Sequence, residues 1–258
     1  MLILLSPAKS LDYLSPFPVV DHSKPQFLKR TADLIGQLKE LSPADLSSLM
    51  KISAALAELN MQRYKDWSPR SSTKNARPAV FAFDGDVYKG LDVRSLNGRQ
   101  VEYLQNNLRI LSGLYGVLRP LDLMQPHRLE MGTRLTTEKG RNLYDFWEDA
   151  VSENLNDALA SHCTKAIVNL ASEEYFGVVN KGKLSARIIT PVFEDWKNGK
   201  YKIISFFAKN ARGAMARYAA KHAVENPELL KRCDAGGYQF DAEVSDVDTW
   251  RFRRRVEN

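Results

Sequence analysis

Residues 108–135 read LRILSGLYGVLRPLDLMQPHRLEMGTRL, and this stretch is the least ordinary part of the chain. Its glycines and prolines break any long helix, so we expect a series of short, sharply turned pieces. The rest of the chain should be arranged around these pieces. Four arginines recur among the apolar residues of the stretch: Arg109, Arg119, Arg128 and Arg134.

These arginines allow two interpretations. A planar guanidinium binds two oxygens at once, so arginines held on turns suit a phosphate or a carboxylate ligand. Alternatively, they pair with acidic residues and cross-link the fold; Asp122 and Glu130 are the acidic residues of the stretch. Pairing is the ordinary expectation for any single arginine. The four together favour an anionic ligand.

The composition is that of an ordinary soluble globular protein. The chain has 258 residues, of which 44% are hydrophobic and 26% are charged. A net charge of +6 permits nucleic acid or another polyanion as a partner but does not require one. Cys163 and Cys233 give no disulfide framework, which favours a reducing compartment. No secretory signal or membrane-spanning run is visible, so we expect a cytoplasmic protein without a membrane partner.

Strands and helices should alternate along the chain. Short apolar runs and one Asn-Gly turn predict strands at Leu2–Leu5, Ala79–Phe83, Ala166–Leu170, Ala186–Phe193 and Tyr201–Phe206. The tail from Trp250 to Arg255 begins with the alternation of an edge strand. Helical spacing predicts one helix that begins at Pro25 and three further helices that cover Gly98–Asn107, Asn142–Ala160 and Ala208–His222. No composition shift marks a boundary, so we expect a single α/β domain (1–258) around a mixed sheet.

Two short helices are expected within Ala44–Tyr64. Ser42, with Asp45 three residues later, is a start signal for the first helix, and the second begins near Ala54. A pair of helices joined by a tight apolar turn resembles the helix-hairpin-helix element that grips DNA backbones. That element usually has glycines in its turn, whereas Lys51 and a serine flank the central isoleucine here. An ordinary helical hairpin remains the alternative.

Polar turns follow the expected strands, and such turns often carry function in open sheets. Ser6 and Lys9 follow the first strand with the spacing of an acyl-enzyme pair, but the accompanying signatures are absent, so an anion-facing turn is favoured. Asp84 and Asp86 follow the second strand and either bind a cation or orient an arginine. We expect Lys9 to share one edge of the sheet with the arginines of the central stretch.

Basic residues outside the central stretch complete the candidate site. The helix expected at Ala208–His222 presents basic side chains within reach of one face. The full set of candidate DNA- or anion-binding residues is Lys9, Lys51, Lys89, Arg109, Arg119, Arg128, Arg134, Lys209 and Arg212. No catalytic residue is assigned.

Familiar metal and nucleotide motifs are missing from the sequence. The histidines, His22, His127, His162 and His222, are scattered singly, without Cys-x-x-Cys or His-x-x-x-His spacing. There is no Walker loop, dinucleotide fingerprint or Gly-x-Ser-x-Gly elbow. We therefore expect neither a metal nor a cofactor.

Several long strings together resemble the YaaA family of bacterial peroxide-stress proteins. They are LILLSPAKSLDY, FDGDVYKGL, the central stretch, NLYDFW, VNLASEEYF and KIISFFAKNARGAMARY, and they span nearly the whole chain. The resemblance implies a cytosolic protein that limits peroxide damage by keeping unincorporated iron low. It also implies a single α/β domain with a helix-hairpin-helix, at Ala44–Tyr64 here, and a positively charged cleft that binds DNA.

Two hypotheses follow. The first is a DNA-binding stress protein, expected as a monomer, that binds duplex, single-stranded or branched DNA without strong sequence specificity. The second is an enzyme that acts on a nucleic acid or a phosphorylated small molecule, with Ser6, Lys9, Asp84 and Asp86 grouped near the arginines. Convergence of these four groups in a deep pocket would favour the enzyme. A long, open basic groove would favour DNA.

Overall fold

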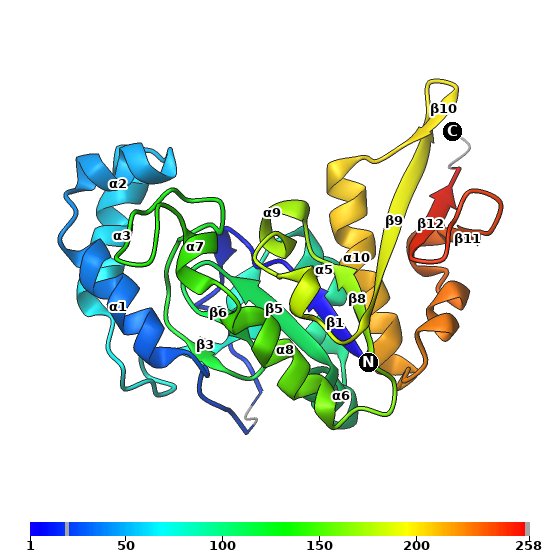
Figure 1. Cartoon of the computed structure of the whole chain (residues 1–258), viewed down its shortest axis with the longest axis horizontal. Coiled ribbons are helices and arrows are strands. Elements are labelled where there is room, and N and C mark those ends of the chain that lie inside the picture. Colours follow the sequence, from blue (N-terminus) through cyan, green and yellow to red (C-terminus); the bar gives the residue numbers. More distant parts are fainter. Residues whose placement is uncertain (19–20, 256–258) are drawn as a thin grey trace.

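The computed structural model describes residues 1–18 and 21–255, and a mixed β-sheet forms its centre (Figure 1). The strands follow the order β11-β12-β9-β8-β1-β5-β6, and β10 pairs with β9. Their bounds are Leu2–Leu5 (β1), Leu108–Ser112 (β5), Gly116–Leu118 (β6), Ala166–Leu170 (β8), Arg187–Lys197 (β9), Lys200–Lys202 (β10), Gln239–Asp241 (β11) and Thr249–Arg254 (β12). The predicted mixed α/β architecture is confirmed.

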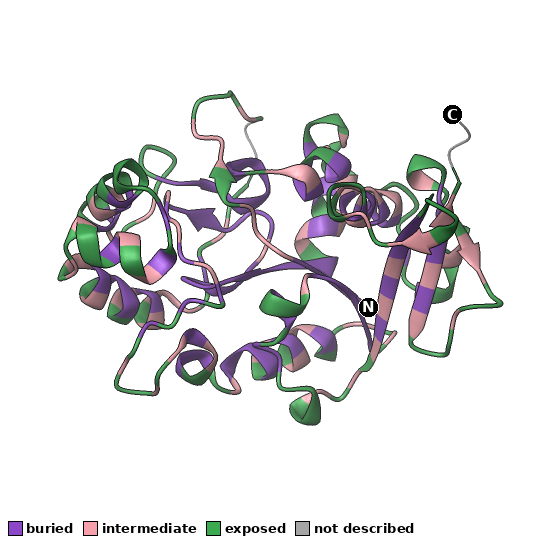
Figure 2. Cartoon of the chain, turned by 90° about the horizontal axis from the view of Figure 1, so that it is seen from above, coloured by how far each residue is buried: buried purple, intermediate pink, exposed green. Residues whose placement is uncertain are grey.

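The middle of the sheet is parallel, whereas β6 folds back antiparallel on β5. In β1, Leu4 lies opposite Arg109 of β5 on one side and Asn169 of β8 on the other. Every residue of these three strands is buried, and Figure 2 shows the buried strands passing between helices on both sides. Covering of both faces explains why the strands are apolar throughout rather than alternating.

This topology gives the sheet two opposite edges, formed by the two ends of its strands. The strands β1, β5 and β8 run in the same direction, so their carboxyl ends meet at one edge, which we call the carboxyl edge. The opposite edge, where β1 and β5 begin, is called the amino edge. Because Leu118 of β6 pairs with Ile110 of β5, the chain leaves β6 at the amino edge. The residues after β6 are therefore separated from the residues after β1.

Two short ladders flank the sheet, and one expected strand is absent. The ladders join β2 (Ser10–Leu11) to β4 (Phe83–Asp84) and β3 (Arg77–Pro78) to β7 (Leu123–Met124). The strand predicted at Ala79–Phe83 is wrong: Ala79–Ala82 forms a helical turn, α4. The amides of Ala79 and Val80 donate to the carbonyl oxygens of Asp122 and Pro120, and these tertiary bonds hold the turn. The apolar run indicated that the segment is buried, but not that its backbone is extended.

The expected pair of helices is present beside the sheet. After α1 (Leu28–Lys39), α2 (Pro43–Met50) begins with a capping box between Ser42 and Asp45. It ends at Lys51, whose φ of 52° turns the chain into α3 (Ala54–Asp66). The two helices are therefore confirmed, and their use as a DNA-gripping helix-hairpin-helix stays a prediction. The first helix begins at Leu28 rather than Pro25 because residues 26–27 form a turn.

The remaining helices correct two further expectations. Their bounds are Asp86–Leu91 (α5), Val93–Ser95 (η1), Gly98–Asn107 (α6), Leu143–Trp147 (α7), Ala150–Ala160 (α8), Glu173–Phe176 (α9), Lys181–Lys183 (η2), Ser205–Lys221 (α10), Pro227–Arg232 (η3) and Ala235–Gly237 (η4). The helix expected over residues 142–160 is broken at Glu148, whose φ is 47°. Phe206 lies in α10, not in a strand, because β10 ends at Lys202. Within the described residues, no helix is both long and apolar enough to cross a membrane.

Close packing fixes α10 against α5. A Cβ atom on Gly213 would lie 1.7 Å from the carbonyl oxygen of Val87, and one on Gly90 would lie 2.0 Å from that of Asn210. Only glycine permits this approach of the two backbones. The crossing fixes the backbone next to Arg212, a candidate site residue.

The carboxyl-terminal strand lies inside the sheet. The Asn-Gly hairpin between β9 and β10 is confirmed, with φ values of 55° at Asn198 and 79° at Gly199. The edge strand expected at the tail is wrong, because β12 pairs with β9 on one side and β11 on the other. Its arginines form ion pairs instead of facing solvent alone; for example, the guanidinium of Arg254 lies 2.6 Å from the carboxylate of Asp195.

Candidate functional site

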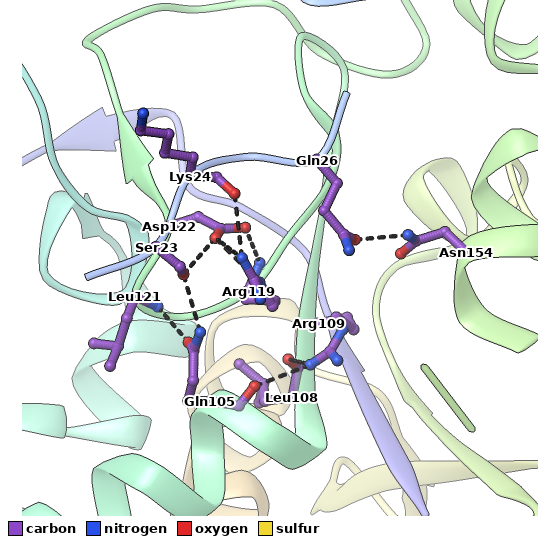
Figure 3. A network of polar contacts seen from close by, with 10 residues as sticks. All are labelled: Ser23, Lys24, Gln26, Gln105, Leu108, Arg109, Arg119, Leu121, Asp122 and Asn154. Atoms are coloured by element: carbon purple, nitrogen blue, oxygen red, sulfur yellow. Dashed lines mark hydrogen bonds and ion pairs between the residues drawn. The ribbon is translucent and has the colours of Figure 1, made fainter. Parts of the chain in front are cut away.

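Arg109 lies buried at the amino edge and completes the end of a helix. Its Nη1 donates to the carbonyl oxygens of Leu108 at 2.8 Å and Gln105 at 3.1 Å (Figure 3). Carbonyl groups at a helix end lack intrahelical partners, so Arg109 satisfies the end of α6. Burial, and secondarily the neighbouring Arg119, lower the pKa of Arg109 to about 10.

Arg119 cross-links the turn that follows β6. Its Nε and Nη2 donate to Oδ1 of Asp122 at 3.2 and 3.0 Å, and its backbone amide donates to Oδ2 at 2.8 Å (Figure 3). The hydroxyl of Ser23 donates to the same carboxylate at 2.6 Å. Asp122 is fully buried, and burial raises its pKa despite these bonds. The cross-linking interpretation therefore describes Arg119 in this structure.

Arg109 and Arg119 line one cavity at the amino edge, far along the strands from Lys9. The cavity has a volume of about 360 Å³, and His162 also lines it. The expectation that Lys9 shares a sheet edge with these two arginines is wrong. The antiparallel return of β6 carries Arg119 back to the start of β5, whereas Lys9 follows the carboxyl end of β1.

Lys9 and Arg128 meet at the carboxyl edge, where they share one carboxylate. The Lys9 Nζ lies 3.1 Å from Oε2 of Glu130, and the Arg128 Nη2 lies 3.0 Å from Oε1. The backbone carbonyl of Arg128 also accepts from the hydroxyl of Tyr64, which joins α3 to this edge. The cavity beside them measures about 20 Å³, which is room for a water molecule rather than a nucleotide.

The four groups of the enzyme hypothesis share neither of the two nearby cavities, and no hydrogen bond or ion pair joins them in the described residues, although β4 places Asp84 opposite Ser10 of β2. The Oγ of Ser6 accepts from the backbone amide of Ser172 at 2.9 Å, so its partner is the start of α9 rather than Lys9. Asp84 lies in β4 and lines a separate cavity of about 200 Å³ with Lys89. Asp86 begins α5 and lines neither cavity. This arrangement gives no support to a nucleophile pair at the first strand end.

Another cavity lies further along the carboxyl edge. It has a volume of about 420 Å³, and Asn169 at the end of β8, Glu173 of α9 and Arg212 of α10 line it. Burial lowers the pKa of Arg212, and Glu173 opposes this shift. Sequence reasoning found Arg212 but missed the other two. The available signal was Asn169, a polar residue inside an otherwise apolar buried strand.

The remaining candidates are exposed and dispersed. Lys51, Lys89, Arg134 and Lys209 form no ion pair within the described part of the chain. Lys51 lies in the turn between α2 and α3, Lys89 lies in α5, and Lys209 lies in α10. The nine candidates therefore do not form a single site. Their contact with DNA stays a prediction.

Potential metal ligands are dispersed in the described residues as well. No group of three or more His, Cys, Asp or Glu side chains in residues 1–18 and 21–255 is placed to hold a metal ion. His127 is buried, and its Nδ1 lies 2.9 Å from the carbonyl oxygen of Gln125. Burial lowers the pKa of His127 to about 4, so this imidazole is neutral at pH 7.

Comparison with known proteins identifies the family. A family model described as peroxide stress protein YaaA matches residues 1–244. A UPF0246 protein of Janthinobacterium sp. (strain Marseille) is 57% identical over 256 residues, covering 99% of both chains. A UPF0246 protein of Ralstonia pickettii (strain 12J) is 56% identical and covers 99% of this chain and 100% of its own. The chain therefore belongs to the YaaA family of peroxide stress proteins.

Proposed function

We propose that the protein acts in the peroxide stress response by binding DNA, without strong sequence specificity, on the side of the sheet that carries the carboxyl edge. Family membership supports the stress role. The net charge of +6 supports a polyanionic partner. The iron-related part of the proposal is protective: bound protein shields DNA from damage by unincorporated iron.

One observation carries the DNA-binding proposal. The segment from the β9–β10 hairpin to the start of α10 carries two exposed aromatic rings and several lysines that have no ion-pair partner in the described residues. We call this segment the hairpin–helix patch: Lys197, Lys200, Lys202, Phe206, Phe207 and Lys209. Phe206 is 55% exposed and Phe207 is 41% exposed, and the guanidinium of Arg254 lies 4.9 Å from the centre of the Phe207 ring. Lysines that track phosphates, combined with rings on which bases stack, are the elements of single-strand binding surfaces.

The positions of other basic groups support a long ligand for this patch. Because β9 is parallel to β8 and extends further, its hairpin projects on the side of the carboxyl edge. Figure 1 shows α2 and α3 at the end of the molecule opposite the β9–β10 hairpin, and Lys51 lies in the turn between them. Lys9 lies between these flanks, at the carboxyl edge itself. Arg109 and Arg119, at the amino edge, have no part in this proposal.

A salt titration tests the proposal. Fluorescence anisotropy would measure the affinity of the full chain for duplex, single-stranded and branched DNA of unrelated sequences. Each phosphate that the protein neutralises makes the slope of log affinity against log salt concentration more negative, by about 0.9 on duplex DNA and about 0.7 on single strands. We expect a slope of about −3 or steeper, with little dependence on sequence. An affinity that does not change with salt would contradict DNA binding through this face.

The protective role has its own test. Plasmid DNA treated with ferrous iron and peroxide is nicked, and we expect stoichiometric amounts of the protein to slow nicking. A Lys209→Ala/Lys200→Ala double variant should protect less, because it removes two charges of the hairpin–helix patch. Equal protection by the variant and the unchanged protein would show that the protection of DNA does not depend on the patch.

A further inference from the structure

The cavity beside Arg212 has the size and position of a small-molecule site. Its volume of about 420 Å³ falls within the range of ligand pockets, roughly 300–1,000 Å³. The end of β8 contributes to its lining, and ligands of open α/β sheets bind outside the carboxyl ends of the strands. The lining residues that matter here are Asn169, Glu173, Phe176, Lys181, Thr190 and Arg212.

Arg212 has an unusual environment. Its side chain is half-buried, yet the guanidinium has no ion pair or hydrogen bond to any described residue. Partly desolvated arginines are normally paired, because an uncompensated buried charge costs free energy. The neighbouring Gly213 packs against Val87 and fixes the backbone that carries Arg212. The arginine is thus held at the cavity wall with its donors unused.

Glu173 lines the same cavity without closing on the arginine. The two side chains form no ion pair within 4.0 Å, and the Glu173 carboxylate accepts no hydrogen bond from a described residue. A second cation, Lys181, lies with its Nζ 5.5 Å from the centre of the Phe176 ring. Asp248 is also in the lining, but Arg187 already occupies it at 2.8 Å. The charged lining side chains that have no ion-pair partner among the described residues are therefore two cations and one carboxylate.

Asn169 adds a directed polar group at the end of β8. Its Oδ1 accepts from the backbone amide of Ala171 at 3.0 Å, which fixes the amide plane. The Nδ2 atom remains as a donor in the cavity lining, since no described residue accepts from it. The ring of Phe176 and the side chain of Ile188 supply an apolar wall. Donors, an acceptor and an apolar wall together describe a site for an organic anion rather than a bare ion.

We propose that this cavity binds a small organic phosphate monoester, with Arg212 and Lys181 on the phosphate and Glu173 accepting from a hydroxyl or N–H group of the same molecule. An arginine fork together with a lysine point charge suits a dianionic phosphate better than a single carboxylate. The six residues of the hairpin–helix patch do not line the cavity, although Ile203, between Lys202 and Phe206, does. Binding of the monoester and binding of DNA are therefore measured separately.

Thermal melting of the full chain, with direct titration by calorimetry, tests the assignment. Adenosine 5′-monophosphate is the main probe; inorganic phosphate, adenosine and succinate separate the contributions of phosphate, base and carboxylate. We expect saturable binding of the monophosphate, weaker binding of inorganic phosphate, and no binding of adenosine or succinate. Absence of saturable monophosphate binding, or binding of succinate with equal affinity, would overturn the proposal.

Matched variants locate the site. Arg212→Gln should weaken monophosphate binding at least tenfold and leave the ligand-free melting temperature unchanged or raised, because it removes an unpaired, partly desolvated charge. Lys181→Gln, at an exposed position that tolerates replacement, should weaken binding severalfold. Lys221→Gln, on the same helix as Arg212 but outside the cavity, is the control and should bind normally. Undiminished binding by Arg212→Gln and Lys181→Gln would refute the site. DNA affinity, measured separately, distinguishes this failure from a failure of the DNA-binding proposal.

Discussion

Replacing Arg119 by alanine should destabilise the fold rather than remove a ligand site. The change deletes both side-chain hydrogen bonds from the guanidinium to Asp122, at 3.2 and 3.0 Å, and the bond to the carbonyl of Lys24. Asp122 would keep only the Ser23 hydroxyl and one backbone amide. The variant therefore leaves a fully buried carboxylate without its counter-charge.

The expected loss is about 2–3 kcal/mol at pH 7. Breaking a buried ion pair by removing one partner costs about 3–5 kcal/mol. The Arg119 side chain is 30% exposed, so solvent already screens part of the attraction and the expected loss falls to or somewhat below the lower end of that range. Burial raises the folded pKa of Asp122 above 3.8, and loss of Arg119 raises it further. A carboxyl group with a raised folded pKa costs stability when ionised and stops doing so when protonated. The destabilisation should therefore shrink as the pH falls from 7 toward 4.

Urea unfolding followed by circular dichroism at pH 7 and pH 4.5 measures this effect. Arg99→Ala is the matched control, because Arg99 is exposed in α6 and forms no ion pair within the described chain. An Arg119→Ala/Asp122→Asn double variant should recover part of the loss, since it removes the stranded charge. A loss below about 0.5 kcal/mol at pH 7 would refute this account of Arg119. So would a loss that is the same at both pH values.

Two further predictions concern packing and pH. Gly213→Ala should lower the free energy of unfolding by about 3 kcal/mol or more, because its Cβ would lie 1.7 Å from the Val87 carbonyl oxygen. Gly36→Ala, in open space on α1, should raise it by about 0.5–1 kcal/mol in the same urea experiment. Equal effects of the two substitutions would contradict the close crossing of α5 and α10. Burial lowers the folded pKa of His127 from 6.5 to about 4, so as the pH falls this imidazole is protonated in the unfolded chain before it is protonated in the folded one. The neutral, buried His127 should therefore contribute about 3 kcal/mol to the free energy of unfolding, fully present above pH 6.5 and lost as the pH falls to 4. His127→Phe should flatten the plot of unfolding free energy against pH between 6.5 and 4. A plot for the variant that runs parallel to that of the unchanged protein would contradict the burial argument.

Local signals in the sequence predicted local structure correctly. The capping box of Ser42 and Asp45 begins α2, and the pair Asn198 and Gly199 forms the hairpin turn, because each depends on neighbouring backbone groups alone. Residues 79–83 failed because hydrogen bonds to the carbonyls of Pro120 and Asp122, distant in sequence, decide their conformation. An apolar run of this length does not distinguish a strand from a buried helical turn.

The candidate site was predictable only in part for a similar reason. The sequence predicts arginines on turns; Arg119 lies in the turn after β6, whereas Arg109 lies in strand β5. It does not indicate the antiparallel return of β6, which carries Arg119 to the amino edge and away from Lys9. Periodicity marked Arg212 as part of a basic helix face. Its position beside Asn169 depends on the crossing of α5 and α10, which no local pattern encodes.

The most direct test of DNA binding through the hairpin–helix patch compares two lysines of one helix. Lys209 lies in the patch and Lys221 lies at the far end of α10; both are exposed and neither forms an ion pair within the described residues. The measurement is the affinity of Lys209→Ala and Lys221→Ala for single-stranded and duplex DNA across a salt series. We predict that Lys209→Ala lowers affinity severalfold and makes the salt slope shallower by about 0.7–0.9, while Lys221→Ala changes neither. Identical affinities and slopes for the two variants would contradict DNA binding at this patch.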